Sequence, residues 1–424
     1  MKSLLSVTFL TGLLTLGRMM ASFVVAKIVA IYAGPSGIAM LGQLQNFINS
    51  ISGVINSSVN SPVVRFTSEN YSKGFTECIP WWRGCVRISI IIYCCLVPII
   101  ILSSKFISEF LFLESDLYWV VLASLFSLPL TAVGTLVNSV INGQQRYKQY
   151  VLLGGISVVI SSAIMIAIVI HYSIKGALIA ISLQNAAIGI VMLSFAFTQK
   201  WFKVKHFIGP VNKEHTKVIL GYVSMAIVSA LTMPTALLFV RTLLVNRYGW
   251  EYAGYWQAVW KVSETYLSVV TISLSIYYLP QLAKLKNIHE IKREINGTIK
   301  IVMPIIILMA LSVYFLRDFI ISVLFTSQFK IARDYFFVQL VGDVIKILSW
   351  LYAYSMISRG AFKWFIGTEI LSSAGFIVLA YIFIAIYGVH GANIAYALNY
   401  TIYLIVVFVN FDRIYKSVEN KDRS

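Results

Sequence analysis

The chain is dominated by apolar blocks that are long enough to cross a lipid bilayer. Between short polar stretches these blocks run for about 20 to 30 residues, which is the length of a transmembrane helix. Of the 424 residues, 58% are hydrophobic and only 12% are charged, with a mean hydropathy of +0.81. Soluble globular domains do not have this composition. The sequence therefore predicts an all-α membrane protein and excludes a soluble enzyme, a secreted protein and a disordered chain.

The apolar blocks predict twelve transmembrane helices. We expect them at residues 3–33, 36–64, 84–104, 117–141, 149–171, 175–199, 217–246, 251–283, 298–316, 334–357, 361–387 and 389–411. Most of the 34 Lys and Arg residues fall in loops that face the cytoplasm if the N-terminus does. Because cytoplasmic loops are enriched in Lys and Arg, we expect both termini to be cytoplasmic. The formal net charge of +17 then reflects topology, and no nucleic acid is expected as a partner.

The sequence contains an internal repeat. The segments KGALIAISLQ, from Lys175, and HGANIAYALN, from His390, align without a gap, and Gly34 aligns with Gly249 at the same spacing. We call this spacing the repeat offset. A slightly larger shift pairs Gly143 with Gly360. We interpret GPSG, which begins at Gly34, as a tight turn between two helices. Transporters are often built from two related halves, and six spans in each half make these repeats parallel.

The repeat predicts two six-helix bundles, at residues 1–205 and 206–424, that face each other across an axis normal to the membrane. The longest outer connection, from Arg317 to Arg333, is too short for the catalytic loop of a polymerase or glycosyltransferase. The sequence has no GxxxxGK[ST] loop for nucleotide phosphates and no cluster of His and Cys for a metal. We therefore expect a protein that is not an enzyme and that needs no cofactor and no metal.

Polar residues line one face of the span at 36–64, at steps of three and four residues. They are Gly42, Gln45, Asn46, Asn49, Gly53, Asn56 and Asn60. At the repeat offset the same face carries Gln257, Trp260, Lys261, Glu264, Ser268, Thr271 and Ser275. Such residues either hold neighbouring helices together or line a shared aqueous cavity. The match between the halves favours the cavity, where Asn46, Asn49, Asn56 and Gln257 would bind substrate.

Charged residues lie inside several spans, where each one costs about 2.5 to 3.5 kcal/mol on insertion scales. The cations are Arg18, Lys27, Arg241, Lys261 and Lys346, and the anions are Glu264, Asp343 and Glu369. The pairs Lys261–Glu264 and Asp343–Lys346 are one helical turn apart, so they are either internal ion pairs or parts of a functional site. The surplus of cations favours an anionic substrate. The carboxylates are candidates for holding a coupling proton or sodium ion.

Arg18 and Lys27 raise a geometric question, because both lie in the first span. They are nine residues apart in the sequence, which places them on opposite sides of a straight α-helix. They would face one cavity only if the helix bent, and Gly17 is the residue that would permit a bend.

Four segments resemble the Wzx-type polysaccharide flippases of the MOP (multidrug/oligosaccharidyl-lipid/polysaccharide) superfamily. They are AKIVAIYAGPSGIAMLGQ, from Ala26 to Gln43, and GYWQAVWKVSETYLS, IYYLPQLAKL and QLVGDVIKI. The resemblance extends over essentially the whole chain and is closest to enterobacterial members that move O-antigen units and the common-antigen lipid III. It implies a V-shaped pair of bundles around a cationic central cavity, in the inner membrane of a bacterium.

The resemblance also implies a substrate, an undecaprenyl-diphosphate-linked oligosaccharide that moves from the cytoplasmic to the periplasmic leaflet by alternating access. Its diphosphate would be the anion that offsets Arg18, Lys27, Arg241 and Lys261. Arg65 would meet the diphosphate first, or would serve only as a topology determinant. Membrane lipid, a polysaccharide polymerase and a chain-length regulator are the implied partners. A cation-coupled multidrug or small-solute exporter and a non-transporting scaffold subunit are the alternatives.

Overall fold

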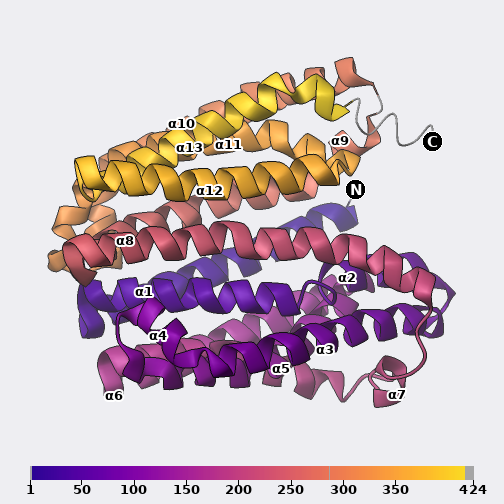
Figure 1. The fold of residues 1–424 in the computed structure, drawn as a ribbon. Helices are drawn as coiled ribbons and strands as arrows, with labels where there is room; N and C mark the ends of the chain where they lie inside the picture. The colour runs from indigo at the N-terminus through magenta and orange to yellow at the C-terminus, as the bar shows by residue number, and fades with distance from the viewer. Residues whose placement is uncertain (1, 286, 416–424) are drawn as a thin grey trace. The chain divides into compact units, whose positions relative to one another are not determined.

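The computed structural model describes residues 2–285 and 287–415, and within these ranges the chain forms helices and turns without a β-strand (Figure 1). Inside a bilayer a helix satisfies all the backbone hydrogen bonds of its own segment, which is why apolar blocks of this length fold in this way. The helices are α1 (Lys2–Ile55), α2 (Ser61–Asn70), α3 (Ile79–Leu102), α4 (Ser104–Phe112), α5 (Tyr118–Gly143), α6 (Tyr147–Ala196), α7 (Val204–Phe207), α8 (Lys213–Ser273), α9 (Leu279–Lys284), α10 (Ile288–Leu324), α11 (Phe336–Arg359), α12 (Phe362–Tyr387) and α13 (His390–Val409).

Short irregular helices connect these elements. They are the 3-10 turns Tyr71–Lys73, Phe75–Cys78, Ser115–Leu117 and Ser327–Tyr335, and a π-helical segment at Leu274–Tyr278.

Nine helical segments of the described residues are long and apolar enough to cross a membrane. Three of these segments contain a residue with non-helical dihedral angles: Gly34 in α1, Ser173 in α6 and Gly249 in α8. At each of them one helix ends and the next begins, and a boundary between two predicted spans falls at the same place. The predicted count of twelve spans is therefore compatible with the structure, and the all-α membrane fold is confirmed.

Three predicted spans differ most from the structure in their bounds. The helix expected at 36–64 ends at Ile55, and a turn precedes α2, which has Pro62 in its first turn. Proline has no backbone N–H and fits the first turn of a helix, so the chain starts a new helix there. The span expected at 251–283 changes to a π-helix after Ser273. Because α1 ends at Ile55, Asn56 and Asn60 lie beyond it. The predicted polar face therefore does not lie on one continuous helix.

The third difference concerns α10, which was expected at residues 298–316. It begins after Asn287, whose side chain accepts a 2.9 Å hydrogen bond from the backbone N–H of His289 and caps the helix. It then continues to Leu324, and Ser327–Tyr335 forms a 3-10 turn. The expected outer loop from Arg317 to Arg333 is therefore largely helical.

Backbone geometry supports the internal repeat. Gly34 has φ 62° and ψ −166°, and its counterpart Gly249 has φ 84° and ψ 171°. Glycine adopts such a positive φ without the steric penalty that a Cβ atom would bring. The same sharp turn therefore joins the first two helices of each repeat.

Two further pairs of residues with positive φ are separated by the repeat offset. Ser173 (φ 49°, ψ −129°) corresponds to Gly388 (φ 63°, ψ −144°). Gln145 (φ 57°) corresponds to Gly360 (φ 67°). The predicted pairing of Gly143 with Gly360 at a larger shift is therefore wrong, because the matching turn conformation is that of Gln145.

The aligned glycines Gly176 and Gly391 make equivalent contacts. A Cβ atom on Gly176 would collide with the backbone carbonyl of Ile168, and one on Gly391 would collide with the carbonyl of Phe383. Ile168 and Phe383 are themselves separated by the repeat offset. Only glycine allows this close return of the chain onto the preceding helix, so the two halves share a local fold as well as scattered sequence identities.

The chain divides into two compact units, which we call unit 1 and unit 2. Unit 1 comprises Met1–Ala33 and Met40–Pro234, and unit 2 comprises Gly34–Ala39 and Thr235–Ser424. All three changes from one unit to the other therefore fall inside helices: two in α1, at Gly34 and after Ala39, and one in α8, after Pro234. The division into bundles at residues 1–205 and 206–424 stays a prediction.

Each unit has its own packed interior. In unit 1, α5 lies along α6 (Figure 1). The Ser124 hydroxyl of α5 donates a 3.0 Å hydrogen bond to Ser182 of α6, and Gly134 lies close to Gly189. Such small residues let membrane helices approach each other closely. In unit 2, α11 and α12 both pack against α13, which places the polar residues of α11 in the interior.

Candidate functional site

Arg241 is a fully buried arginine in unit 2. Its guanidinium contacts two residues that lie on the other side of the turn at Gly249. Its Nη2 donates a hydrogen bond to Oε1 of Gln257, and Trp256 presents its ring 5.7 Å from the guanidinium carbon. All three residues lie on α8, on opposite sides of Gly249. The turn at Gly249 reverses the chain and so brings together residues that are 16 positions apart.

Asp343 of α11 is a fully buried carboxylate that receives hydrogen bonds from two other helices. The Tyr266 hydroxyl of α8 donates to Oδ2 at 2.7 Å, and the Tyr396 hydroxyl of α13 donates to Oδ1 at 2.8 Å. Gln339, one turn before Asp343, contributes a longer contact of 3.3 Å. A buried carboxylate needs such donors because its hydration is lost. Asp343 therefore joins α8, α11 and α13.

Lys346 lies one turn after Asp343, and its ammonium is surrounded by aromatic rings. The ring centroids of Trp350, Tyr400, Tyr396 and Trp260 lie 4.9, 5.4, 5.8 and 5.9 Å from Nζ. These distances are in the range of cation–π attraction. We call these four rings the Lys346 cage.

Acidic side chains link these groups electrostatically. Glu264 attracts both Arg241 and Lys346, and Glu369 and Asp343 also attract Lys346. Unit 2 thus brings together six predicted site residues: Arg241, Gln257, Glu264, Asp343, Lys346 and Glu369. We call this set the charge cluster.

Lys261 lies one turn before Glu264 on α8, and its side chain is partly exposed. The described residues include no hydrogen-bond or ion-pair partner for its ammonium within the distance limits of such bonds. Among the predicted cations inside the spans of unit 2, Arg241 and Lys346 have contacts described above, whereas Lys261 can meet an anionic ligand without breaking a contact of this kind.

The aromatic and tyrosine residues of this region were not predicted as site residues. A signal was present in the sequence, because Tyr396, Tyr400 and Tyr403 recur at steps of four and three residues on one face of a mostly apolar helix. Which carboxylate or cation they contact is decided by the packing between helices, which the spacing does not specify.

Arg18 and Lys27 lie on the first part of α1, in unit 1. Arg18 is exposed, and its Nη2 reaches to within 3.2 Å of where a Cβ on Gly154 of α6 would lie. Lys27 is half-buried. Gly17 keeps helical dihedral angles, and the break in α1 is at Gly34 instead. Arg18 and Lys27 therefore project from opposite sides of one helical segment.

The second part of α1 and the turn that follows it carry the predicted amide residues. Asn49 is exposed and accepts a 3.1 Å hydrogen bond from Gln45, while Asn46 and Asn56 are half-buried. Four buried atoms here have no hydrogen-bond partner among the described residues: Nδ2 of Asn46, Oγ of Ser50, Oγ of Ser52 and Oδ1 of Asn56. An unpaired buried polar atom costs about 1 to 3 kcal/mol. This stretch of α1 therefore retains unused capacity to bind polar groups.

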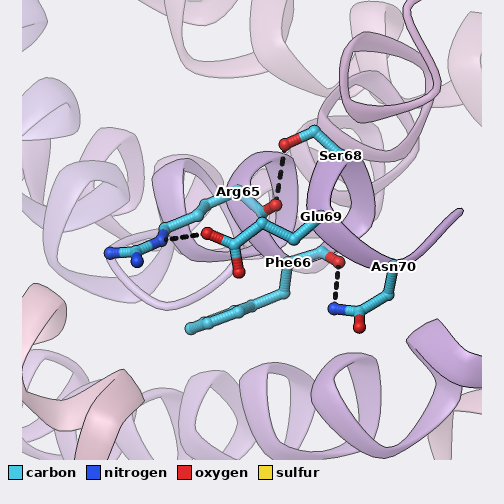
Figure 2. Close-up of polar contacts among 5 residues, drawn as sticks. All are labelled: Arg65, Phe66, Ser68, Glu69 and Asn70. Carbon is cyan, nitrogen blue, oxygen red and sulfur yellow. Dashed lines mark hydrogen bonds and ion pairs between the residues drawn. The ribbon is translucent and has the colours of Figure 1, made fainter.

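Arg65 of α2 lies in an exposed ion pair in unit 1. Figure 2 shows its Nε bound to Oε1 of Glu69 at 2.7 Å, one turn further along the helix. The guanidinium also lies over the rings of Tyr222, at 5.2 Å, and Phe66, at 5.8 Å. Half of the Arg65 side chain is exposed, at 50%. Because exposed ion pairs are weak, Arg65 can exchange Glu69 for another anion.

Comparison with known proteins places this chain in a family. A family model described as "Polysaccharide biosynthesis protein" matches residues 81–333, which is more than half of the chain. The chain belongs to this family. The predicted resemblance to polysaccharide flippases is confirmed by this match together with the relatives that follow.

Two curated relatives of this chain are named "Lipid III flippase", one from Escherichia coli (strain K12) and one from Shigella flexneri. Each is 26% identical over 407 residues, which cover 95% of this chain and 96% of the relative. Among solved structures, an inward-facing multidrug resistance MATE family transporter of the MOP superfamily has a TM-score of 0.76. That match has 13% sequence identity and covers 95% of this chain and 96% of the other, so it shows a shared fold.

Proposed function

We propose that this protein is a flippase for undecaprenyl-diphosphate-linked oligosaccharide units, such as O-antigen or a related surface polysaccharide. It carries them from the cytoplasmic to the periplasmic leaflet of the bacterial inner membrane by alternating access. The observation that carries the proposal is the similarity, over nearly the full length of both chains, to two lipid III flippases. The cations inside unit 2 support it, because a membrane interior retains such charges only where they have a use.

The diphosphate is assigned to the cations of α8. Lys261 is a direct ligand, because its ammonium has no internal partner to lose among the described residues. Arg241 carries several N–H donors, and Gln257 and Trp256 hold its position. Charged donors bind phosphate oxygens with short, strong hydrogen bonds. A headgroup with at least two negative charges is therefore a suitable partner for this part of unit 2.

The glycan is assigned to the amide residues of α1 and of the turn that follows it. Asn46, Asn49 and Asn56 provide donors and acceptors that match sugar hydroxyls, and buried atoms of Asn46 and Asn56 are unpaired among the described residues. In this proposal the polyprenyl tail stays in membrane lipid. Arg18, Lys27 and Arg65 assist the headgroup in unit 1, with Arg65 as its first contact at the cytoplasmic end.

The acidic members of the charge cluster are the candidates for energy coupling. Glu264, Asp343 and Glu369 all attract Lys346, so a proton or sodium ion that binds there would change the balance of charge around the headgroup. In this proposal both termini are cytoplasmic, and the protein moves its substrate without covalent chemistry. A polysaccharide polymerase and a chain-length regulator would receive the translocated unit.

The test is deletion of the gene in its native bacterium, followed by analysis of lipid-linked glycans and surface polysaccharide. We expect diphosphate-linked units to accumulate on the cytoplasmic face and surface glycan to be lost. A plasmid copy should restore the glycan, and so should one carrying Lys300→Ala, which removes an exposed lysine of α10. A copy carrying Lys261→Ala should not restore it.

The outcome also separates this proposal from the alternative of a cation-coupled exporter. Unchanged glycan after deletion, together with increased susceptibility to cationic drugs, would contradict the flippase proposal and support the exporter. Full restoration by Lys261→Ala would leave the flippase proposal intact but remove Lys261 from the binding site.

A further inference from the structure

The Lys346 cage holds the ammonium of a lysine in surroundings that suit a bound cation. Its rings come from three helices, with Trp260 on α8, Trp350 on α11, and Tyr396 and Tyr400 on α13. Lys346 is partly buried. Its ammonium is held by attraction to the rings and to the carboxylates of Asp343, Glu264 and Glu369.

The walls of the cage are fixed by contacts that do not involve Lys346. The Tyr396 hydroxyl is bound to Asp343 at 2.8 Å. The Tyr396 ring makes edge contacts with Trp260 and Tyr400, with centroid distances of 5.1 and 5.0 Å. The cage can therefore keep its shape when the lysine leaves, and the four-carbon stem of lysine allows the ammonium to move while the helices stay in place.

A phosphate group competes well with such a cage. Aromatic rings attract a cation through a quadrupole, and this attraction is weaker than that of an ionised phosphate oxygen, which forms a charged hydrogen bond. Lys346 lies near Glu264, one turn from Lys261 on α8. Lys261 and Lys346 therefore both lie close to Glu264, in the same part of unit 2.

We propose that Lys346 is a further ligand of the diphosphate headgroup, and that the Lys346 cage is the position where its ammonium rests when no headgroup is bound. The headgroup must draw Lys346 out of the cage in order to bind fully. The cage therefore lowers the affinity for the headgroup, since part of the binding free energy is spent on releasing the lysine. This inference rests on the proposed function, because it takes the headgroup to be the ligand of unit 2.

The proposal predicts whether a substitution in the cage raises or lowers the affinity for the headgroup. Replacing a cage ring should raise headgroup affinity, whereas loss of an ordinary packing residue or of a substrate-contacting ring should lower it or leave it unchanged. Trp350→Leu removes the ring closest to Lys346. The matched control is Tyr352→Leu on the same helix, where the partly buried ring packs against Phe408 and Phe411 and not in the cage.

The experiment measures the dissociation constant of undecaprenyl diphosphate for the full-length protein in lipid nanodiscs. We expect Trp350→Leu to bind about five-fold more tightly than the parent, which is the effect of losing one cation–π contact in the free state. We expect Tyr352→Leu to gain no affinity. In a Lys346→Met background, which binds more weakly than the parent, Trp350→Leu should have no effect.

Either of two results would overturn the inference while leaving the proposed function in place. One is a parent protein that binds the probe and a Trp350→Leu variant that binds it no more tightly. The other is an equal gain from Trp350→Leu with and without Lys346. Failure of the parent to bind undecaprenyl diphosphate at all would contradict both the inference and the proposed function. Thermal unfolding of each variant confirms that the protein measured is folded.

Discussion

The hydrogen bond from Tyr396 to Asp343 provides the sharpest test of how unit 2 is held together. The substitution Tyr396→Phe removes only a hydroxyl group, and the ring stays available for Trp260, Tyr400 and Lys346. What is lost is a 2.8 Å bond to a fully buried carboxylate. Asp343 would keep the Tyr266 hydroxyl and the longer contact to Gln339.

The expected loss of stability in Tyr396→Phe depends on the charge of the acceptor, Asp343. A hydrogen bond to a charged group contributes about 1.5 to 3 kcal/mol to stability, whereas one to a neutral acceptor contributes about 1 kcal/mol. The Tyr278 hydroxyl donates at 2.8 Å to the neutral backbone carbonyl of Leu351. Tyr396→Phe should therefore lower the free energy of unfolding by about 2 kcal/mol, and Tyr278→Phe by about half of that.

The assay is reversible unfolding by denaturant in mixed micelles, with Tyr400→Phe as the matched control. Tyr400 is one turn further along α13, and no hydrogen bond of its hydroxyl is found among the described residues. The control should therefore unfold at nearly the same denaturant concentration as the parent. If Tyr396→Phe and Tyr400→Phe had equal effects, the Asp343 hydroxyl bonds would not be a source of stability.

Three further predictions concern other parts of the chain. Gly189→Ala should destabilise the protein, because its Cβ would collide with the carbonyl of Leu130, whereas Gly155→Ala on the same helix has open space and should be neutral or stabilising by about 1 kcal/mol in thermal unfolding. Arg65→Ala should change stability by less than about 1 kcal/mol, since its ion pair is exposed, yet should slow glycan transport in cells. Asn46→Leu should keep or raise the melting temperature, because it removes a buried amide nitrogen that has no hydrogen-bond partner among the described residues, while it lowers transport in the same complementation assay.

The fold could be predicted from the sequence wherever length and polarity decide the structure. The glycine turn at Gly34 and its counterpart at Gly249 were found because the apolar blocks end there and the two residues align. The helix end at Ile55 was missed, because Asn56 and Asn60 continue the spacing of the polar face and so were assigned to the same helix. Ser173 was not expected to have a positive φ, since serine gives no signal for that conformation, although the span boundary was placed beside it.

The candidate site could be predicted only in part. Charge in an apolar span identified Arg241, Asp343 and Lys346, because the energetic cost of a buried charge is independent of the fold. The spacing of residues on one helix suggested a direct partnership of Asp343 with Lys346. It could not show that Tyr266 and Tyr396 bind the carboxylate, because both belong to other helices and their contacts depend on the packing between helices.

The two halves share a backbone repeat but differ in chemistry, and this difference is itself testable. Lys261 and Glu264 of unit 2 correspond, at the repeat offset, to Asn46 and Asn49 of unit 1. If the protein needed only a total positive charge, the position of the lysine would not matter. In our proposal the lysine acts with Arg241 and the acidic residues of the charge cluster, which the amide face of α1 lacks.

The exchange of these residues distinguishes the two possibilities. Lys261→Asn should abolish complementation of the deletion strain, and adding Asn46→Lys in the same chain should not restore it, although the total charge is that of the parent. Asn46→Lys alone serves as the control for damage to unit 1. Restored transport in the double variant would show that the two positions are equivalent, and the assignment of diphosphate to unit 2 and glycan to unit 1 would then fail. Because the same turns and helices present both positions, a lack of restoration in a folded protein would be due to the surrounding side chains.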